Sequence, residues 1–548
     1  MPAGMRWLGS WGGGAADLRY QSGGTENAHR PGTDRMVSDP PLSLRPMPSQ
    51  RLVPTAWRAP AAIALAYLLS RLGFFLAGVR LNTIGIVGHQ YPQQLDLALL
   101  KSQPITSLWH LHSQPPLFNL VTGFLVRLPV GLQQPAVVFA MLLLGLVLVL
   151  SCYYLCIELG IPQWLAVALS VLVILDPAYV LYEGLFYYTY PTSALITFTA
   201  LCLARYLRTK GMVWGILFVG SVSVVVLMNS TFQWVWLVLC IVPVAVAVKR
   251  DWRKFLAVAA VPLLLVSFWY AKNAVLFSTY STSSWLGMNL EKITTAQATS
   301  AERQSLVNEG TLTPIVALPA FFTSIPGYVP RYSNHPLTGV AVLDQKTKSD
   351  GTPNFNNINI ISVANQYLKN DVGFIAARPK TYARSVASAF TLFMVPSDQY
   401  FICWHGEEKI LPYVRAYDLL VEGQVYGTSI QTMWTDANQS SAPSAKHISV
   451  LAVMEIGATV CLLPILVWRR RRNHAVMLTM GFIWVTTVYV LVVTNFVELG
   501  ENNRFRFDLG PLPLIALALS AMAVVHRIRS KTSSNDSFSA GSLSESDS

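Results

Sequence analysis

Charged residues whose chemistry suits phosphates and hydroxyls stand in four short polar stretches of the sequence. Asp96 is the one carboxylate between residues 79 and 134, in the stretch GHQYPQQLDLALL. A carboxylate held beside a reacting group can act as the general base that deprotonates a hydroxyl or an amine. A surface aspartate on a loop helix is the simpler interpretation, and the sequence leaves both open.

A second acid, Glu183, lies in the stretch YEGLFYYTYP among four tyrosines that include Tyr187. Tyrosine rings stack against the apolar face of a sugar while an acid binds its hydroxyls, so this stretch suits a carbohydrate. The same tyrosines could form the aromatic belt of a membrane protein, although a glutamate inside such a belt needs a partner for its charge.

Two arginines, Arg504 and Arg506, stand in the stretch ENNRFRFD. A guanidinium presents a rigid fork of donors that matches a phosphate, so these residues predict an anion site. Pairing with the nearby acids Glu498, Glu501 and Asp508 is the alternative. Glu501 would then orient an arginine rather than compete with a ligand.

Further candidates for the same site come from a fourth stretch and from a second part of the first loop. Lys272 and Asn273 lie in WYAKNAVLF near the end of an apolar run, where the lysine either meets a phosphate or extends its ammonium to the membrane surface. His112 and Gln114 come just before Pro115, and the N-terminus of a following helix favours anions. His112 lacks the neighbouring ligands of a metal site, so no metal site is predicted.

Membrane-spanning helices must position these residues, because the 548-residue chain is 53% hydrophobic and only 12% charged, with a mean hydropathy of +0.42. Runs of about 18 apolar residues predict membrane spans. Lipid restricts such spans to helices, so we expect an all-α polytopic protein. The predicted spans are 57–78, 135–156, 163–180, 190–205, 212–228, 233–248, 254–277, 447–468, 475–494 and 509–526.

The net charge of +12 comes largely from basic clusters beside apolar runs, which is the pattern of cytoplasmic loops rather than of nucleic-acid binding. With these clusters inside, both termini are cytoplasmic and all four polar stretches face outward. The apolar stretches 115–129 and 385–395 are then expected to lie in the outer interface. The six cysteines form neither a disulfide framework nor a CxxC site.

This topology divides the chain into five parts. They are a disordered cytoplasmic tail, a transmembrane catalytic module with outer loops, an outer loop region, C-terminal transmembrane helices and a second disordered cytoplasmic tail: 1–56, 57–278, 279–446, 447–526 and 527–548.

The order of these stretches resembles the GT-C superfamily of membrane glycosyltransferases. The closest likeness is to bacterial proteins akin to the protein O-mannosyltransferases and the lipid A aminoarabinose transferase. It rests on Asp96, HSQPPLFN, YEGLFYYTYP, KNAVLF followed by SSWLGMNL, and ENNRFRF, and it covers about residues 57–526. The chain departs from the family pattern in two places: Leu95 precedes the acid where mannosyltransferases have a pair, and Gln114 stands where relatives often have lysine.

The resemblance implies a bundle of about ten transmembrane helices, with eleven to thirteen left open, in the inner membrane of a bacterium. It also implies a sugar donor carried on a polyprenyl phosphate and a glycan, lipid or protein acceptor on the outer side. Asp96 then takes the place of the acid that activates the acceptor, and Glu183 that of the second-loop acid. Arg504 and Arg506 take the place of the residues that hold the lipid phosphate.

Two questions stay open at this point. A divalent cation could assist the transfer, and no certain cofactor is predicted. A transporter or flippase of lipid-linked or anionic solutes is the alternative function, and it predicts charges at mid-membrane depth and broken helices.

Overall fold

A computed structural model describes residues 57–542, apart from 87, 249–250, 427–446 and 470–472. The predicted N-terminal tail and the last six residues lie outside the described residues. The described part is almost wholly helical, with one antiparallel pair of three-residue strands, β1 (Gln424–Tyr426) and β2 (His447–Ser449). The prediction of an all-α protein is confirmed.

Each of the ten apolar windows falls on a helix. The helices are α1 (Arg58–Leu76), α5 (Val130–Glu158), α6 (Gln163–Leu175), α8 (Thr189–Thr209), α9 (Met212–Met228), α10 (Trp234–Ala247), α11 (Trp252–Phe277), the continuous run α21–α22 (Val450–Arg469), α23 (His474–Val497) and α25 (Leu512–Ser542). Among the described residues, six helices are long and apolar enough to cross a membrane, or seven if the bent pair of α6 and α7 (Pro177–Glu183) is one span. The chain is therefore a multi-pass membrane protein. The shorter α9 and α10 are apolar helices of 17 and 14 residues.

The helix α25 extends beyond the predicted end of the last span, through most of the segment 527–548 that was predicted to be disordered. Neither proline nor glycine occurs between Pro513 and Gly541, so no residue in this part of the chain breaks the helix. The polar composition of the segment, on which the prediction of disorder rested, does not by itself prevent a helix from continuing.

The break between α6 and α7 sets the course of the second loop. Asp176 accepts a hydrogen bond from the backbone N–H of Ala178 at 2.7 Å, and Pro177 begins α7. An aspartate cap followed by proline is a strong start signal for a helix, so the chain bends by 55° between α6 and α7. Glu183 is the last residue of α7, and the tyrosine-rich turn follows it.

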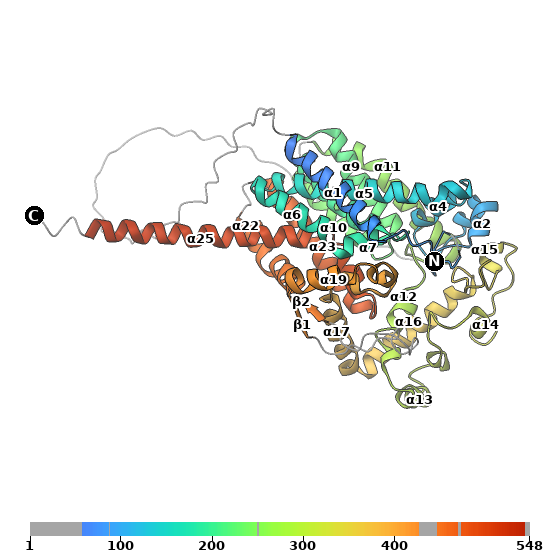
Figure 1. Ribbon diagram of the computed structural model, residues 1–548. Helices are drawn as coiled ribbons and strands as arrows, with labels where there is room; N and C mark the ends of the chain where they lie inside the picture. Colours follow the sequence, from blue (N-terminus) through green and yellow to red (C-terminus); the bar gives the residue numbers. More distant parts are fainter. Residues whose placement is uncertain (1–56, 87, 249–250, 427–446, 470–472, 543–548) are drawn as a thin grey trace, which may run out of the picture. The chain divides into compact units, whose positions relative to one another are not determined.

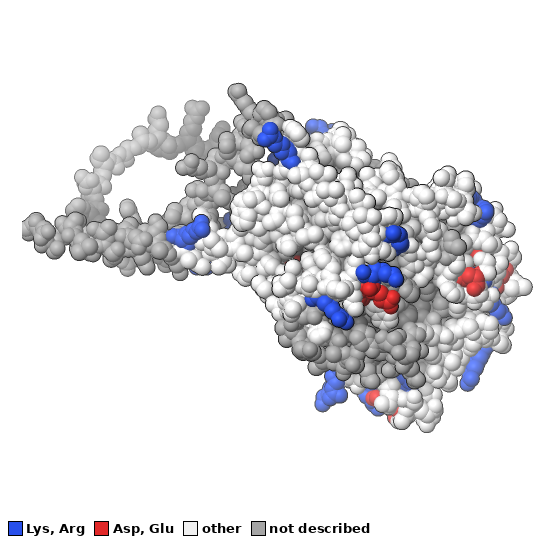
Figure 2. Space-filling model, viewed as in Figure 1, with Lys and Arg blue, Asp and Glu red and all other residues white. Residues whose placement is uncertain are grey.

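At the centre of the bundle, α8 packs against α5, α9 and α23, while α11 packs against α9. Gly145 of α5 is required for this packing, because a Cβ there would lie 2.1 Å from the Tyr67 hydroxyl and 2.4 Å from that of Tyr190. Figure 1 shows α1, α5, α9 and α11 together in the upper part of the view. The face shown in Figure 2 bears few charged side chains.

The region predicted as the outer loops contains the helices α12 (Leu286–Glu291), α13 (Ser300–Asn308), α14 (Ile325–Tyr328), α15 (Ala341–Asp344), α16 (Asn359–Ala377) and α17 (Pro379–Phe393). Four of them, α12, α13, α14 and α16, contribute to a second, smaller core. Trp285, Tyr328, Tyr367 and Phe374 are buried within it. Gly287 lets α12 approach α16 closely, because a Cβ there would lie 2.0 Å from the carbonyl oxygen of Ala364.

Short helices of the polar stretches complete the arrangement. The first loop contains α2 (Leu97–Ser102), α3 (Pro104–Trp109) and α4 (Pro116–Leu125), and the last contains α24 (Asn502–Phe507). The two predicted interfacial segments, 115–129 and 385–395, correspond largely to α4 and α17. Their position in a membrane interface stays a prediction.

Candidate functional site

A cavity of about 910 Å³ lies where the polar stretches meet. Its walls come from the first loop at Tyr91–Gln93 and Gln114, from Tyr187 and Tyr188, from residues 230–235 and 280–292, from 400–404, and from 489–505. Sites of this size that combine many apolar and aromatic side chains with a few polar groups are typical of small-molecule binding. Segments separated by more than 400 residues in sequence therefore share one wall.

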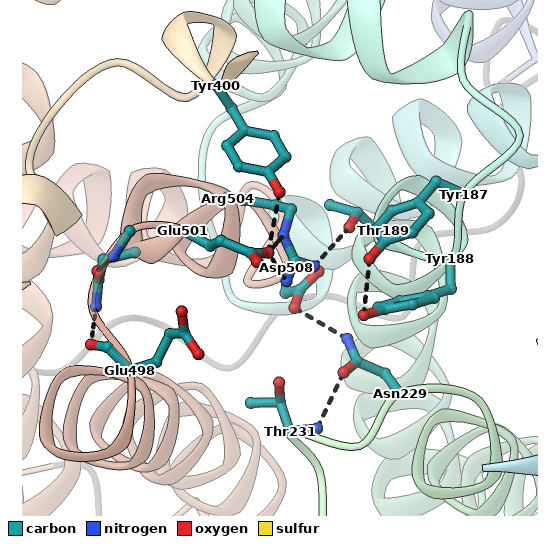
Figure 3. Close-up of polar contacts among 12 residues, drawn as sticks. Tyr187, Tyr188, Thr189, Asn229, Thr231, Tyr400, Glu498, Glu501, Arg504 and Asp508 are labelled. Atoms are coloured by element: carbon teal, nitrogen blue, oxygen red, sulfur yellow. Dashed lines mark hydrogen bonds and ion pairs between the residues drawn. The ribbon is translucent and has the colours of Figure 1, made fainter. Parts of the chain in front are cut away.

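A buried cluster of charges around the start of α24 forms part of the wall of this cavity (Figure 3). Arg504 donates from Nε to Glu501 Oε2 at 2.8 Å, and one of its terminal nitrogens lies 2.5 Å from the same oxygen. Its other terminal nitrogen donates to the Thr189 hydroxyl at 3.2 Å. The Tyr400 hydroxyl donates to Glu501 at 2.9 Å. These contacts fix the guanidinium at the cavity wall.

Lys292 brings a second cation to the cluster from the smaller core. It lies directly after α12, contacts Glu498 Oε1, and lies 3.4 Å from Glu501 Oε1. Sequence reasoning missed this residue. The available signal was the excess of acids in the last loop, because Glu498, Glu501 and Asp508 outnumber its two arginines and therefore require a cation from elsewhere.

The two acids of the cluster differ in their affinity for protons. Burial alone would raise the pKa of Glu501, but Arg504 and Lys292 outweigh burial and lower this pKa to about 2. Burial raises the pKa of Glu498 to about 7, against the attraction of Lys292. At neutral pH Glu501 is thus a fixed anion, whereas Glu498 can take up and release a proton.

Aromatic rings surround the guanidinium of Arg504. Its central carbon lies 4.4 Å from the ring centre of Phe505, 5.5 Å from that of Tyr187, and 5.7 Å from those of Tyr188 and Tyr400. Tyr187 and Tyr188 stack on each other with ring centres 4.3 Å apart. Ring faces attract a cation, and they also offer flat apolar surfaces for a sugar.

Asp96 is buried and does not line this cavity. It caps α2 by accepting a hydrogen bond from the N–H of Ala98 at 3.0 Å. It also accepts hydrogen bonds from Ser349, at 3.0 Å from the backbone N–H and 2.5 Å from the hydroxyl. Both of its oxygens therefore hold protein groups. Its role as general base stays a prediction.

Glu183 is likewise buried away from the cavity. Its Oε2 lies 2.8 Å from Nε of Arg71 on α1 and accepts a hydrogen bond from the Tyr190 hydroxyl at 2.7 Å. The partner that a glutamate in an aromatic belt requires is thus Arg71, and the pair joins α1 to the end of α7.

The candidates near the end of α11 and in the first loop have structural partners. Lys272 donates to the carbonyl of Leu111 at 2.6 Å, with its ammonium 3.8 Å from the ring centre of Trp269. Asn273 donates to the carbonyl of Ser281 at 2.7 Å. These two residues are buried and do not line the cavity.

His112 is fully buried as well. Its ring nitrogens lie 2.9 Å from the Ser284 hydroxyl and 3.0 Å from the carbonyl of Asn356. Burial lowers the pKa of His112 to about 3, so the ring is neutral. Gln114, two residues further on, does line the cavity.

The two arginines of the last loop point to different surroundings. Arg504 lines the cavity, whereas Arg506 donates to the carbonyl of Val395 at 3.1 Å and lies 3.9 Å from Glu455. Positions two apart on a helix face different directions, which explains the difference. Of the residues singled out in the sequence, the cavity brings together Gln114, Tyr187, Glu498, Glu501 and Arg504. Asp96, His112, Glu183, Lys272, Asn273 and Arg506 lie outside its wall.

Among the described residues, no group of three or more His, Cys, Asp or Glu side chains is arranged to hold a metal ion.

Comparisons with known proteins include a similar solved structure. No protein-family model matches the chain, and no curated protein matches it. A crystal structure of ArnT from Cupriavidus metallidurans in the apo state is 12% identical to it, with 84% of this chain and 78% of the other covered and a TM-score of 0.26. ArnT belongs to the membrane glycosyltransferases that the sequence resembles. With so low an identity and TM-score, the match assigns neither a residue role nor an activity to this chain.

Proposed function

We propose that the chain is an integral-membrane glycosyltransferase. It moves a monosaccharide from a polyprenyl-phosphate donor to an acceptor on the outer face of a bacterial plasma membrane. The single observation that carries the proposal is the guanidinium of Arg504, buried at the wall of a large aromatic-lined cavity. The resemblance of the polar stretches to the GT-C superfamily supports the same function.

Arg504 suits the phosphate of such a donor. The leaving group of sugar transfer is an anion. A hydrogen-bond donor that is already fixed beside the leaving oxygen stabilises the transition state. Glu501, Thr189 and the surrounding rings hold the guanidinium in one orientation, so little reorganisation is required when the phosphate arrives. Lys292 lies on the other side of Glu501 and adds a second positive charge.

The rest of the cavity wall suits the two other parts of the donor. Tyr187, Tyr188 and Trp285 offer ring faces for a sugar. Val235, Val493 and other apolar residues of α10 and α23 also line the cavity and suit a prenyl chain. A site for a soluble sugar phosphate would have no use for such an apolar surface.

The acids Asp96 and Glu183 enter this proposal through the family resemblance alone. The contacts of Asp96 with Ser349 and of Glu183 with Arg71 give each acid a structural role as well. The alternative function, transport or flipping of a lipid-linked solute, is favoured by one observation. The buried pair of Arg71 and Glu183 involves α1, which is long and apolar enough to span a membrane.

The test uses the purified full chain in lipid nanodiscs. The probes are undecaprenyl phosphates carrying radiolabelled glucose, mannose, galactose, arabinose or 4-amino-arabinose. Water serves as the acceptor in this assay, and the readout is free labelled sugar. We expect Arg504→Gln to lower the rate by about 100-fold or more, the size of effect measured when one anion-stabilising donor is removed.

Arg506→Gln is the matched control, because it removes the same group two positions away and outside the cavity. We expect its loss to be at least about tenfold smaller than that of Arg504→Gln. Equal losses in the two variants would contradict the phosphate role of Arg504. A wild-type protein that releases sugar from none of the donors, but moves an intact lipid-linked sugar between leaflets, would establish the transporter instead.

A further inference from the structure

We propose that Glu498, rather than Asp96, accepts the proton of the acceptor hydroxyl, and that Asp96 is a positioning residue of the first loop. The inference rests on the proposed sugar transfer and assigns a group within the same cavity. It starts from the question of which carboxylates can reach a substrate bound there.

Among the described residues that line the cavity, the carboxylates are Glu498 and Glu501. A general base must come within hydrogen-bonding reach of the proton that it removes. Asp96, Glu183 and Asp508 do not line the cavity, so they do not meet this condition.

Glu501 is unsuited to accept a proton. Arg504 and the Tyr400 hydroxyl bind its Oε2, and Lys292 lies near its Oε1. These partners favour the ionised form so strongly that the pKa falls to about 2. A carboxylate that holds its negative charge this firmly is a weak base, and its evident task is to orient Arg504.

Glu498 differs from Glu501 in its contacts and its surroundings. Lys292 contacts its Oε1, while the guanidinium of Arg504 binds the other acid of the cluster. In Figure 3 the carboxylate of Glu498 points toward the region between Arg504 and Thr231, another residue of the cavity wall. A proton acceptor placed there lies beside the site of the leaving phosphate without occupying it.

The backbone at Glu498 is fixed, as a catalytic group requires. Asn502 donates from its side-chain amide to the carbonyl of Glu498 at 3.1 Å and to that of Thr494 at 3.3 Å. Its amide also lies 3.1 Å from the side-chain oxygen of Asn495. The end of α23 and the start of α24 are thereby held together, with Lys292 restraining the carboxylate from the side of α12.

The chemical step balances with groups present in the site and its substrates. The acceptor O–H gives its proton to a carboxylate oxygen of Glu498 while the acceptor oxygen bonds to the anomeric carbon. The bond from that carbon to the phosphate oxygen breaks, and its electron pair stays on the phosphate, which leaves as polyprenyl phosphate beside Arg504. Glu498 then releases the proton to water.

Four charged residues set the proton affinity of Glu498. Lys292 and Glu291 come from the side of α12, and Glu501 and Arg504 from the last loop. Burial outweighs the two cations and raises the pKa of Glu498 to about 7. A base with a pKa near the working pH combines a useful ionised fraction with a useful proton affinity.

Asp96 has the contacts of a positioning residue. It caps α2, and it holds Ser349 of the turn that the isolated bridge between Thr347 and Pro353 closes. The neighbouring Lys348 donates to the carbonyl of Tyr91 at 2.8 Å, which attaches the same turn to the cavity wall. Loss of Asp96 would therefore shift the first loop without removing the proton acceptor.

The test measures sugar release to water from the undecaprenyl-phosphate donor that the wild type turns over fastest. We expect Glu498→Gln to lower kcat by about 100-fold or more, with KM changed by less than about threefold. In the wild type kcat should fall as the pH decreases below about 7, the pKa of Glu498. This acid limb of the pH–rate profile should be absent from Glu498→Gln. Glu455→Gln is the matched control and should keep the acid limb, because this acid lies by Arg506, does not line the cavity and is not among the charged groups that set the pKa of Glu498. Asp96→Asn should lower kcat less than Glu498→Gln and should keep the acid limb.

Several results would overturn the inference. It is wrong if Glu498→Gln retains the kcat of the wild type, or if Asp96→Asn loses more kcat than Glu498→Gln and also loses the acid limb. Should Glu498→Gln fail to fold, the pH profiles of the wild type and Asp96→Asn decide, because an acid limb near 7 must be present in both. A wild type that releases sugar from no donor refutes the proposed transfer itself, which is a different failure from that of Glu498 alone.

Discussion

Replacing Glu501 by glutamine separates the binding role of the charge cluster from its structural role. The side chain keeps its shape and loses one negative charge. At pH 8, with Glu498 ionised, the cluster changes from two cations and two anions to two cations and one anion. We expect the variant to be less stable and yet to bind polyprenyl phosphate more tightly.

The loss of stability follows from burial. Removing one partner of a buried ion pair typically costs about 3–5 kcal/mol, because the other charge is left without compensation. Lys292 still contacts Glu498, and Arg504 keeps Thr189 and the ring faces, so the lower end of this range applies. The expected decrease in unfolding free energy is about 3 kcal/mol.

The gain in binding follows from Coulomb's law. A phosphate seated on Arg504 would lie roughly 5 Å from the Glu501 carboxylate, and two like charges at that distance repel by about 3 kcal/mol at an effective dielectric constant near 20. Part of this gain is lost because Glu501 no longer orients the guanidinium. The net expectation is an affinity at least about tenfold higher, which is about 1.4 kcal/mol.

The assay titrates undecaprenyl phosphate into the protein in nanodiscs by calorimetry at pH 8, beside denaturant unfolding of the same samples. Glu455→Gln is the control, because it removes the acid 3.9 Å from Arg506, outside the cavity. This control should lose stability with little change in affinity. Weaker or equal binding by Glu501→Gln, in protein shown to be folded, would refute the electrostatic reasoning.

Three further predictions concern the surroundings of the site. Burial lowers the pKa of His112 to about 3, so its contribution to stability is present above about pH 6.5 and is lost as the pH falls toward 3. In denaturant unfolding measured over this pH range, His112→Gln should lose less stability at low pH than the wild type. Ser349→Ala removes a hydrogen bond to buried Asp96 and should cost about 1–3 kcal/mol, with faster proteolysis of the turn at 347–353. Glu183→Gln leaves Arg71 buried with its main partner uncharged and should cost about 3–5 kcal/mol of unfolding free energy. The yield of folded protein should therefore fall far more than the activity of each folded molecule.

The helices of this protein could be predicted from sequence because their cause is local. A long apolar run in lipid must satisfy its own backbone, and the helix does this within one segment. The boundaries were less predictable: α6 ends at Leu175, short of the end of the apolar window, because Asp176 caps the next helix and Pro177 begins it. The bend at that point depends on two residues rather than on average hydropathy.

The site could be predicted only where its cause was also local. The excess of charge in the last loop identified Arg504 and Glu501, which pair three residues apart. Lys292 lies 206 residues from its partner Glu498, and no periodicity connects them. Arg504 and Arg506 could not be distinguished in advance, because the orientation of the short helix α24 is set by packing against α8, α17 and α23.

The opposite roles of the two acids in the cluster follow from the number of hydrogen-bond donors and cations that contact each carboxylate. Glu501 is bound by Arg504, Lys292 and Tyr400, and these contacts outweigh the cost of burying its charge. Glu498 is buried to a similar extent and has Lys292 as its contacting cation. Burial raises the pKa of Glu498 more than Lys292 lowers it. Two carboxylates three residues apart can thus serve as a permanent counter-ion and as a titrating group in one cavity. A phosphate that binds Arg504 adds negative charge beside both, which raises the proton affinity of Glu498 further. The donor itself would then make its neighbouring base stronger at the moment when the acceptor must be deprotonated.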